Sequence, residues 1–314
     1  MEDYPKTWAE FEAWFPTEEA CRDYVFRLRW PEGFRCTRCR EAGAWLVGKT
    51  LYECHRCGHQ TSVTAGTIFQ DTHKPLKTWF QAIWLVTSQK TGASAVGVQR
   101  VLGLGSYKTA WSWLHKLRRA MVRPDRERLS GRIEVDEAYW GGEREGVRGR
   151  KTLGKSIILV AAQEDGSAIG RIRLRRVKSI SAPCLHAFIE ESIEPGSTVH
   201  TDGGGGYLGI EKKGYRHNVT ALQGHKSASK LLPHVHRVIS LLKRWLQGTH
   251  QGAIGHGHLD YYLDEFTFRF NRRTSRHRGK LFYRLLSQAV NVAPSPYKRM
   301  IHHARGRHAV NPNK

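Results

Sequence analysis

Four cysteines near the N-terminus form two Cys-x-x-Cys pairs, and their spacing constrains the fold more than any other feature. Cys36 pairs with Cys39 and Cys54 with Cys57, and fourteen residues separate the two pairs. This arrangement is typical of one tetrahedral Zn²⁺ held by four thiolates. Free or disulfide-bonded cysteines are the alternative. Because four cysteines close the coordination sphere, we interpret the site as a structural zinc ribbon and not as an active site.

The charge of the chain indicates what it binds. It has 51 Lys and Arg against 28 Asp and Glu, a formal net charge of +23 over 314 residues. Such a surface attracts phosphate backbones at long range, whereas a basic surface without a partner is the alternative. With neither a signal peptide nor an apolar run near the roughly 20 residues that span a bilayer, we expect a soluble cytoplasmic protein. Basic and aromatic residues also surround the cysteines, which favours contact with nucleic acid: Arg35, Arg38, Arg40, Trp45, His55, Arg56 and His59.

Two DNA-binding segments are predicted within residues 1–125. Residues 1–63 contain the ribbon and, around Trp8 and Phe11, aromatic residues at helical spacing that we expect to pack as a small helix against it. Residues 64–125 predict helices over 76–88, 94–102 and 106–122, with Gly103 in a turn and Ser106 as an N-cap. The last two helices resemble a helix-turn-helix, and a plain helical linker is the alternative. The third helix carries basic residues suited to DNA: Lys108, Lys116, Arg118 and Arg119.

After Pro124 the pattern predicts an α/β domain over 130–273. Strands are expected at 132–140, 157–162, 168–174 and 197–200, and helices at 182–192, 234–247 and 259–271. This order predicts a mixed sheet. Residues 267–314 contain twelve Lys and Arg and no Asp or Glu, so 274–314 is predicted to be a basic, partly mobile tail.

Two aspartates lie at ends of predicted strands. Asp136 is on the first strand and Asp202 follows the fourth. Two carboxylates at a sheet edge can hold a pair of Mg²⁺ ions for phosphoryl transfer, but aspartates at strand ends also cap turns. His236 and Lys243 are seven residues apart, so they share a face of the predicted helix over 234–247. A lone histidine on a helix is otherwise an ordinary surface or core residue.

The ordered motifs resemble the DDE-type transposases of bacterial insertion-sequence family 1595, also called ISXO-like. They run from the cysteine pairs through residues 66–69, 133–142, 200–202 and 240–244 to 262–273, so the resemblance covers about residues 18–275. It implies an RNase H-like catalytic domain that uses two Mg²⁺ or Mn²⁺ ions. Asp136, Asp202 and His236 would bind the ions as an Asp-Asp-His variant, and Lys243 would contact DNA near the scissile phosphate.

Neighbouring residues leave alternatives for these roles. His234 competes with His236 as the third ligand. Glu134 shares the strand face of Asp136 and can have an accessory role, whereas Glu137 points to the other face, where we expect a salt bridge. Residues 149–156 satisfy the phosphate-loop pattern G-x-x-x-x-G-K-S. Because a strand and not a helix is predicted after them, we interpret them as a basic hairpin and not an ATP site.

The predicted function is a transposase that cleaves the ends of its own element and joins them to target DNA. The partners would be double-stranded DNA, as terminal inverted repeats and target, and further copies of the chain in a dimer or larger paired-end complex at the nucleoid. A catalytically inactive, domesticated DNA-binding protein and an RNase H-like structure-specific nuclease are the alternatives.

Overall fold

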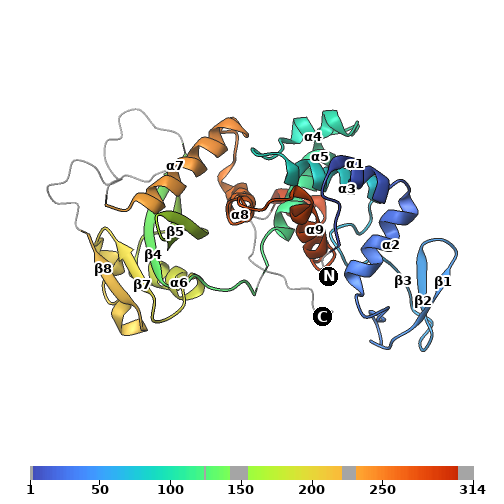
Figure 1. Ribbon diagram of the computed structural model, residues 1–314, viewed down its shortest axis with the longest axis horizontal. Coiled ribbons are helices and arrows are strands. Elements are labelled where there is room, and N and C mark those ends of the chain that lie inside the picture. The colour runs from blue at the N-terminus through green and yellow to red at the C-terminus, as the bar shows by residue number, and fades with distance from the viewer. Residues whose placement is uncertain (1–2, 124, 142–154, 221–230, 303–314) are drawn as a thin grey trace. The chain divides into compact units, whose positions relative to one another are not determined.

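The chain folds into two compact units in the computed structural model, which describes residues 3–123, 125–141, 155–220 and 231–302 (Figure 1). One unit combines Met1–Pro124 with Thr274–Lys314, and the other is Asp125–Arg273. No helix within the described ranges is both long and apolar enough to cross a bilayer.

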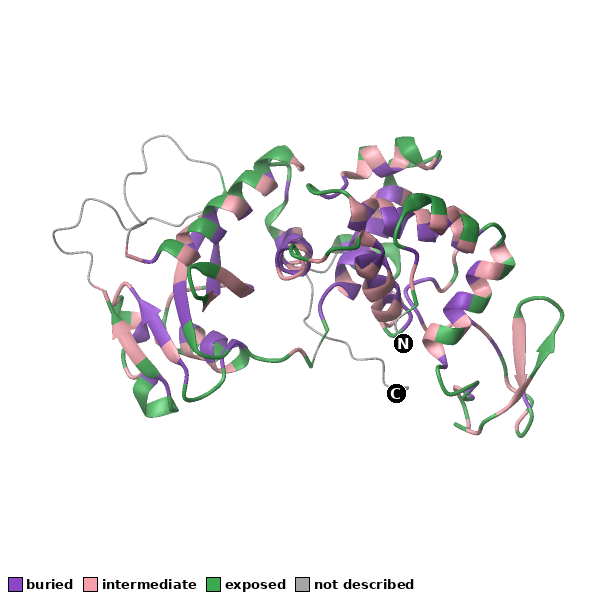
Figure 2. Ribbon diagram, viewed as in Figure 1, coloured by how far each residue is buried: buried purple, intermediate pink, exposed green. Residues whose placement is uncertain are grey.

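The first unit contains the ribbon and a helical core. The ribbon is a small antiparallel sheet in the order β1-β2-β3, and its β1–β2 hairpin is largely exposed (Figure 2). The elements of this unit are α1 (Trp8–Trp14), α2 (Glu18–Arg29), β1 (Ala44–Val47), β2 (Leu51–Cys54), β3 (Gln60–Ser62), α3 (Leu76–Ser88), α4 (Ala95–Val101), α5 (Tyr107–Ala120), α9 (Arg278–Ala289) and α10 (Tyr297–His302).

The N-terminal aromatic helix does not pack against the ribbon, so that prediction is wrong. On α1, Phe11 is fully buried, and its ring centroid lies 5.0 Å from that of Trp84 on α3 and 5.5 Å from that of Phe282 on α9. The helix that packs on the ribbon is α2, which the sequence analysis missed: Phe26 lies 4.8 Å from Tyr52 of β2, centroid to centroid. The burial of large aromatic rings outweighs closeness along the chain.

The predicted basic tail is wrong for residues 278–302. They form α9, which packs on α3, and α10, which packs on α5. Phe282 is fully buried and contacts the aromatic cluster of α1 and α3, so α9 completes the core of the first unit. The apolar stripe of α9 decides this fold in spite of its positive charge. Residues 303–314 of the predicted tail lie outside the described residues.

Helices α4 and α5 form the predicted helical pair. Ser106 caps α5, because its Oγ accepts from the backbone N–H of Lys108 at 3.2 Å, and Gly103 has a φ of 59°, which favours glycine. Arg118 is only 2 % exposed, so it belongs to the core and does not lie on a DNA-facing surface as expected. DNA recognition by this pair stays a prediction.

The second unit is a mixed five-stranded sheet in the order β6-β5-β4-β7-β8, counted within the described ranges. The pairs β4/β5 and β5/β6 are antiparallel, whereas β4/β7 and β7/β8 are parallel. Its elements are β4 (Arg132–Trp140), β5 (Ser156–Asp165), β6 (Ala168–Val177), α6 (Ala182–Ser192), β7 (Thr198–Thr201), η1 (Gly205–Tyr207), η2 (Ile210–Lys213), β8 (Arg216–Val219), α7 (Pro233–Gly248), η4 (His256–His258) and α8 (Leu259–Phe270).

Helices cover both faces of this sheet (Figure 1). The apolar side chains of β4, β5 and β6 divide between two cores, one on each face. On β4, Ile133 and Val135 pack with α6, whereas Ala138 and Trp140 pack with α7 and α8. Glu134 and Asp136 alternate with the first pair, so they point to the face that α7 covers.

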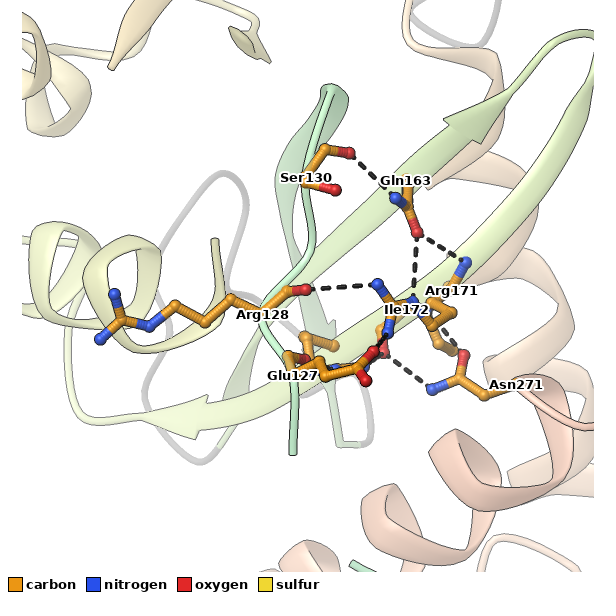
Figure 3. A network of polar contacts seen from close by, with 8 residues as sticks. Glu127, Arg128, Ser130, Gln163, Arg171, Ile172 and Asn271 are labelled. Atoms are coloured by element: carbon orange, nitrogen blue, oxygen red, sulfur yellow. Dashed lines mark hydrogen bonds and ion pairs between the residues drawn. The ribbon is translucent and has the colours of Figure 1, made fainter. Parts of the chain in front are cut away.

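The outer edge of β6 is covered by side chains (Figure 3). Asn271, just after α8, accepts from the backbone N–H of Ile172 at 2.7 Å and donates to the carbonyl of Ile172 at 3.2 Å. Arg171 donates to the Glu127 carboxylate at 2.8 Å and to Gln163 Oε1 at 3.4 Å. The two Asn271 contacts pair backbone groups that an edge strand leaves open, so Asn271 has a structural role here.

Candidate functional site

The four ribbon cysteines gather into one cluster, and their Sγ atoms lie within 4.8 Å of one another. Cys36 Sγ lies 3.7 Å from Cys57 Sγ, and Cys39 Sγ lies 3.6 Å from Cys54 Sγ. Four thiolates bound tetrahedrally to zinc at about 2.3 Å would be about 3.8 Å apart, so the donors fit this ion. Burial disfavours the Cys36 thiolate, but N–H donors of Cys39 and Arg38 outweigh it and lower the pKa of Cys36 to about 7.

The second candidate centre begins with the parallel register of β4 and β7. The last pair in this register is Glu134 with His200; Asp136 and Asp202 each follow two residues later, and Asp202 lies one residue past the end of β7. Asp136 points to the α7 face of β4. The two predicted carboxylates therefore belong to neighbouring parallel strands, Asp136 within β4 and Asp202 just past β7.

The turn after β7 shapes the position of Asp202. Its Oδ1 accepts from the backbone N–H of Gly204 at 3.0 Å. Gly203 has a φ of 81°, and a Cβ there would lie 2.5 Å from Val219 Cγ1. A glycine is therefore required at this turn, and the Gly203–Gly206 run serves the placement of Asp202.

Helix α7 brings two histidines to two carboxylates of β4. His236 Nε2 lies 3.7 Å from Asp136 Oδ2, whereas His234 Nδ1 lies 2.7 Å from Glu134 Oε1. The shorter distance is a direct hydrogen bond. The longer one leaves room for a shared ion, because two bonds of about 2.1 Å can join atoms 3.7 Å apart. The geometry favours His236 over His234 as a ligand.

The surroundings of the site lower the pKa of His236 and raise the pKa of a buried tyrosine, Tyr207. Burial lowers the pKa of His236, because desolvation disfavours the imidazolium, and this effect exceeds the opposing attraction of Glu134 and Asp202. Burial, together with Glu137, Asp136 and Asp202, raises the pKa of Tyr207 well above its ordinary value. His236 therefore keeps a neutral, metal-binding imidazole at a lower pH than an exposed histidine does.

The remaining predicted residues lie at varied distances from this centre. Lys243 is exposed on α7, seven residues and about 10 Å along the helix axis from His236. Glu137 points to the other face as expected, and its carboxylate accepts from Tyr207 Oη at 3.2 Å; the expected salt bridge stays a prediction. Lys155 and Ser156 lead into β5 and not into a helix, which argues against the phosphate loop; residues 142–154 lie outside the described residues.

A second group of possible ligands was missed by the sequence analysis. Glu134, Glu164 and His234 have ligand atoms within 4.8 Å of one another, whereas the described residues do not show Asp136, Asp202 and His236 as such a group. Glu164 also forms a 3.0 Å ion pair with Arg132. The signal for Glu134 was its strand parity with Asp136, but no spacing along the chain connects it to Glu164.

Comparison with known proteins matches the two regions that contain these residues. The family model described as an ISXO2-like transposase domain matches residues 128–271, and the one described as a transposase zinc-ribbon domain matches residues 16–60. A protein in transposable element ISH50 of Halobacterium salinarum is 24 % identical over 286 residues, which cover 85 % of this chain and 94 % of that protein. The chain therefore belongs to the ISXO2-like IS1595 family of transposases.

Proposed function

We propose that this transposase cleaves the ends of its own element and joins them to target DNA in a metal-dependent reaction. The observation that carries the proposal is the meeting of Asp136 and His236, 3.7 Å apart, beside the strand end that bears Asp202. We infer that Asp202, in the turn after β7, joins this pair as the third ligand, because its charge acts on His236.

The donors at this site fit Mg²⁺ or Mn²⁺. Asp136 and Asp202 offer carboxylate oxygens and His236 a neutral imidazole nitrogen, which suits Mn²⁺ better than an all-oxygen site would. Two divalent ions held by these residues would supply Lewis acidity toward the scissile phosphate and would stabilise charge on the attacking and leaving oxygens. Lys243 supplies a positive charge further along α7 for the DNA backbone.

The sheet order supports an RNase H-like domain. Three antiparallel strands, β6, β5 and β4, continue into two parallel strands, β7 and β8, with helices on both faces. In a sheet of this order, carboxylates of the central strand and of its parallel neighbour can share the metals.

DNA recognition is assigned to the first unit. The ribbon carries exposed Arg35, Arg56 and Lys49, and the exposed N-terminal turn of α5 carries Lys108. With the net charge of +23, these residues suit the terminal inverted repeats and the target duplex. Paired-end chemistry requires a dimer or larger complex, acting at the bacterial nucleoid in the cytoplasm.

The test is a strand-transfer assay with a pre-cleaved element end, a plasmid target and Mn²⁺. We expect joined product from the natural protein, and none from Asp136→Ala or His236→Ala, although both variants bind the element end. Cleavage without joining would indicate a nuclease, and end binding without either reaction would indicate a domesticated DNA-binding protein. Activity retained in both variants would refute the proposed ligand set.

A further inference from the structure

Glu134 is buried at the start of α7 and binds that helix to β4. Its side chain is 2 % exposed. Oε1 accepts from His234 Nδ1 at 2.7 Å, and Oε2 accepts from the backbone N–H of Val235 at 2.8 Å. A carboxylate this deeply buried is stable only with such partners, and both oxygens are used in this way.

The start of α7 lacks a cap of its own. Leu232 at the N-cap makes no side-chain capping bond, and Pro233 at the first turn has no N–H to donate. The open N–H groups of a first turn are usually met by a nearby Ser, Thr, Asn or Asp. Here the acceptor is Glu134, 101 residues earlier in the chain, and its negative charge also suits the positive end of the helix.

The same turn of α7 carries His236, and the same face of β4 carries Asp136. Residues two apart on a strand share a face and lie about 7 Å from one another. Glu134 therefore holds the turn at the level where His236 Nε2 comes within 3.7 Å of Asp136 Oδ2. We propose that Glu134 is a positioning residue, which places the His236 imidazole for metal binding; this rests on the proposed function.

The alternative interpretation of this site is a metal ion held by Glu134, Glu164 and His234. The contact of 2.7 Å between Glu134 and His234 is a direct hydrogen bond, and Glu164 is already paired with Arg132 at 3.0 Å. In the ribbon, by contrast, the donor atoms keep 3.6 and 3.7 Å between them. The geometry at Glu134 is that of a hydrogen-bonded cap.

The experiment measures Mn²⁺ affinity by titration calorimetry on the full-length protein with its ribbon saturated with zinc. We expect Glu134→Gln to weaken Mn²⁺ binding about tenfold, as is usual when a residue that orients a metal ligand is lost. The matched control is Glu137→Gln, on the opposite face of β4, which should leave the affinity within about twofold of the natural protein.

A second control separates positioning from loss of stability. Val238→Ala removes a fully buried side chain of α7 but keeps the cap, so it should lower the melting temperature without changing Mn²⁺ affinity. All titrations are done well below the lowest melting temperature. An affinity loss in Val238→Ala equal to that in Glu134→Gln, or no loss in Glu134→Gln, would overturn the proposal.

Two further variants distinguish the possible failures. Loss of Mn²⁺ binding in both His234→Ala and Glu164→Gln, as large as in His236→Ala, would place the ion at Glu134 and overturn the positioning role. Unchanged affinity in His236→Ala would instead refute the metal ligands of the proposed function. We expect a large loss of Mn²⁺ affinity in His236→Ala and little change in Glu164→Gln. The loss of Mn²⁺ affinity in His234→Ala should be smaller than in Glu134→Gln, because the bond from Val235 to Glu134 survives.

Discussion

The zinc ribbon and the β4–α7 centre show two ways of building a ligand set. The ribbon takes its four donors from residues 36–57, where two tight turns each present a pair of thiolates to one point. The proposed β4–α7 centre would take its ligands, Asp136, Asp202 and His236, from a strand, a turn and a helix spread over a hundred residues. A local site depends on turn chemistry, and a dispersed one depends on strand register and helix packing.

The largest expected effect is loss of zinc from the ribbon. Cys36→Ser should release the ion and unfold the ribbon, because zinc binding supplies about 10–16 kcal/mol of apparent free energy in small zinc domains. The second unit should keep its fold, since its sheet is built without these residues. Zinc content and limited proteolysis of the full chain measure both outcomes.

The control for the ribbon is Cys184→Ser, at a half-buried cysteine of α6 outside the cluster. It should leave the zinc content unchanged. If Cys36→Ser retained a full equivalent of zinc, the local ligand set would be wrong and the contrast with the dispersed centre would disappear.

The second test asks how strongly the first unit depends on a distant segment. Phe282→Ala removes a fully buried ring of α9 that contacts Phe11, Phe80 and Trp84, so we expect a loss of about 3–5 kcal/mol in the free energy of unfolding of the first unit. Chemical denaturation followed by tryptophan fluorescence measures it.

Val101→Ala, at a side chain that is 66 % exposed on α4, is the matched surface change and should alter stability by less than about 0.5 kcal/mol. Equal, small effects of the two substitutions would mean that α9 is a detachable tail, as the charge pattern alone predicted.

A third, smaller effect concerns the β6 edge of the sheet in the second unit. Asn271→Ala leaves the N–H and carbonyl of Ile172 without their side-chain partner, which should destabilise the second unit by about 1–3 kcal/mol. Asn291→Ala provides the control, because that exposed amide bonds a single helix carbonyl at 2.8 Å. Thermal unfolding compares them, and an equal loss in both would argue against a special role of the β6 edge.

The smallest effect is a shift in pH dependence. Burial lowers the pKa of His236 below the ordinary value of about 6.5, so the folded state binds its proton less readily than the unfolded state. The contribution of the neutral imidazole to the stability of the folded state is fully present above about pH 6.5 and is lost as the pH falls below that value. Strand transfer should therefore persist at pH 6.5 and decline at lower pH.

His236→Glu tests the assignment of that acidic decline. The variant should keep partial activity with Mn²⁺, and its decline should move toward the ordinary glutamate pKa of about 4.3. Initial rates of strand transfer between pH 4.5 and 8 measure the shift. A decline at the same pH in both proteins would mean that another group titrates.

Local patterns predicted much of the secondary structure. The strand over 132–140, the helices over 76–88 and 182–192 and the Ser106 cap are found where apolar periodicity and capping chemistry put them. The four cysteines and the ordered motifs also led to the family, because spacing along the chain carries that information. The short strand β8 and the helix α2 were missed, since neither has a strong period of its own.

Contacts between distant residues were decided only by the tertiary structure. The sequence left His234 as a competitor of His236, and the packing of α7 on β4 gave them different partners, Glu134 and Asp136. Likewise the sequence predicted α9 to be part of a basic tail, but in the structure Phe282 packs into the aromatic cluster of the first unit. Composition and period describe a segment by itself, whereas register and burial depend on which surfaces meet, and those surfaces come from residues far apart in the chain.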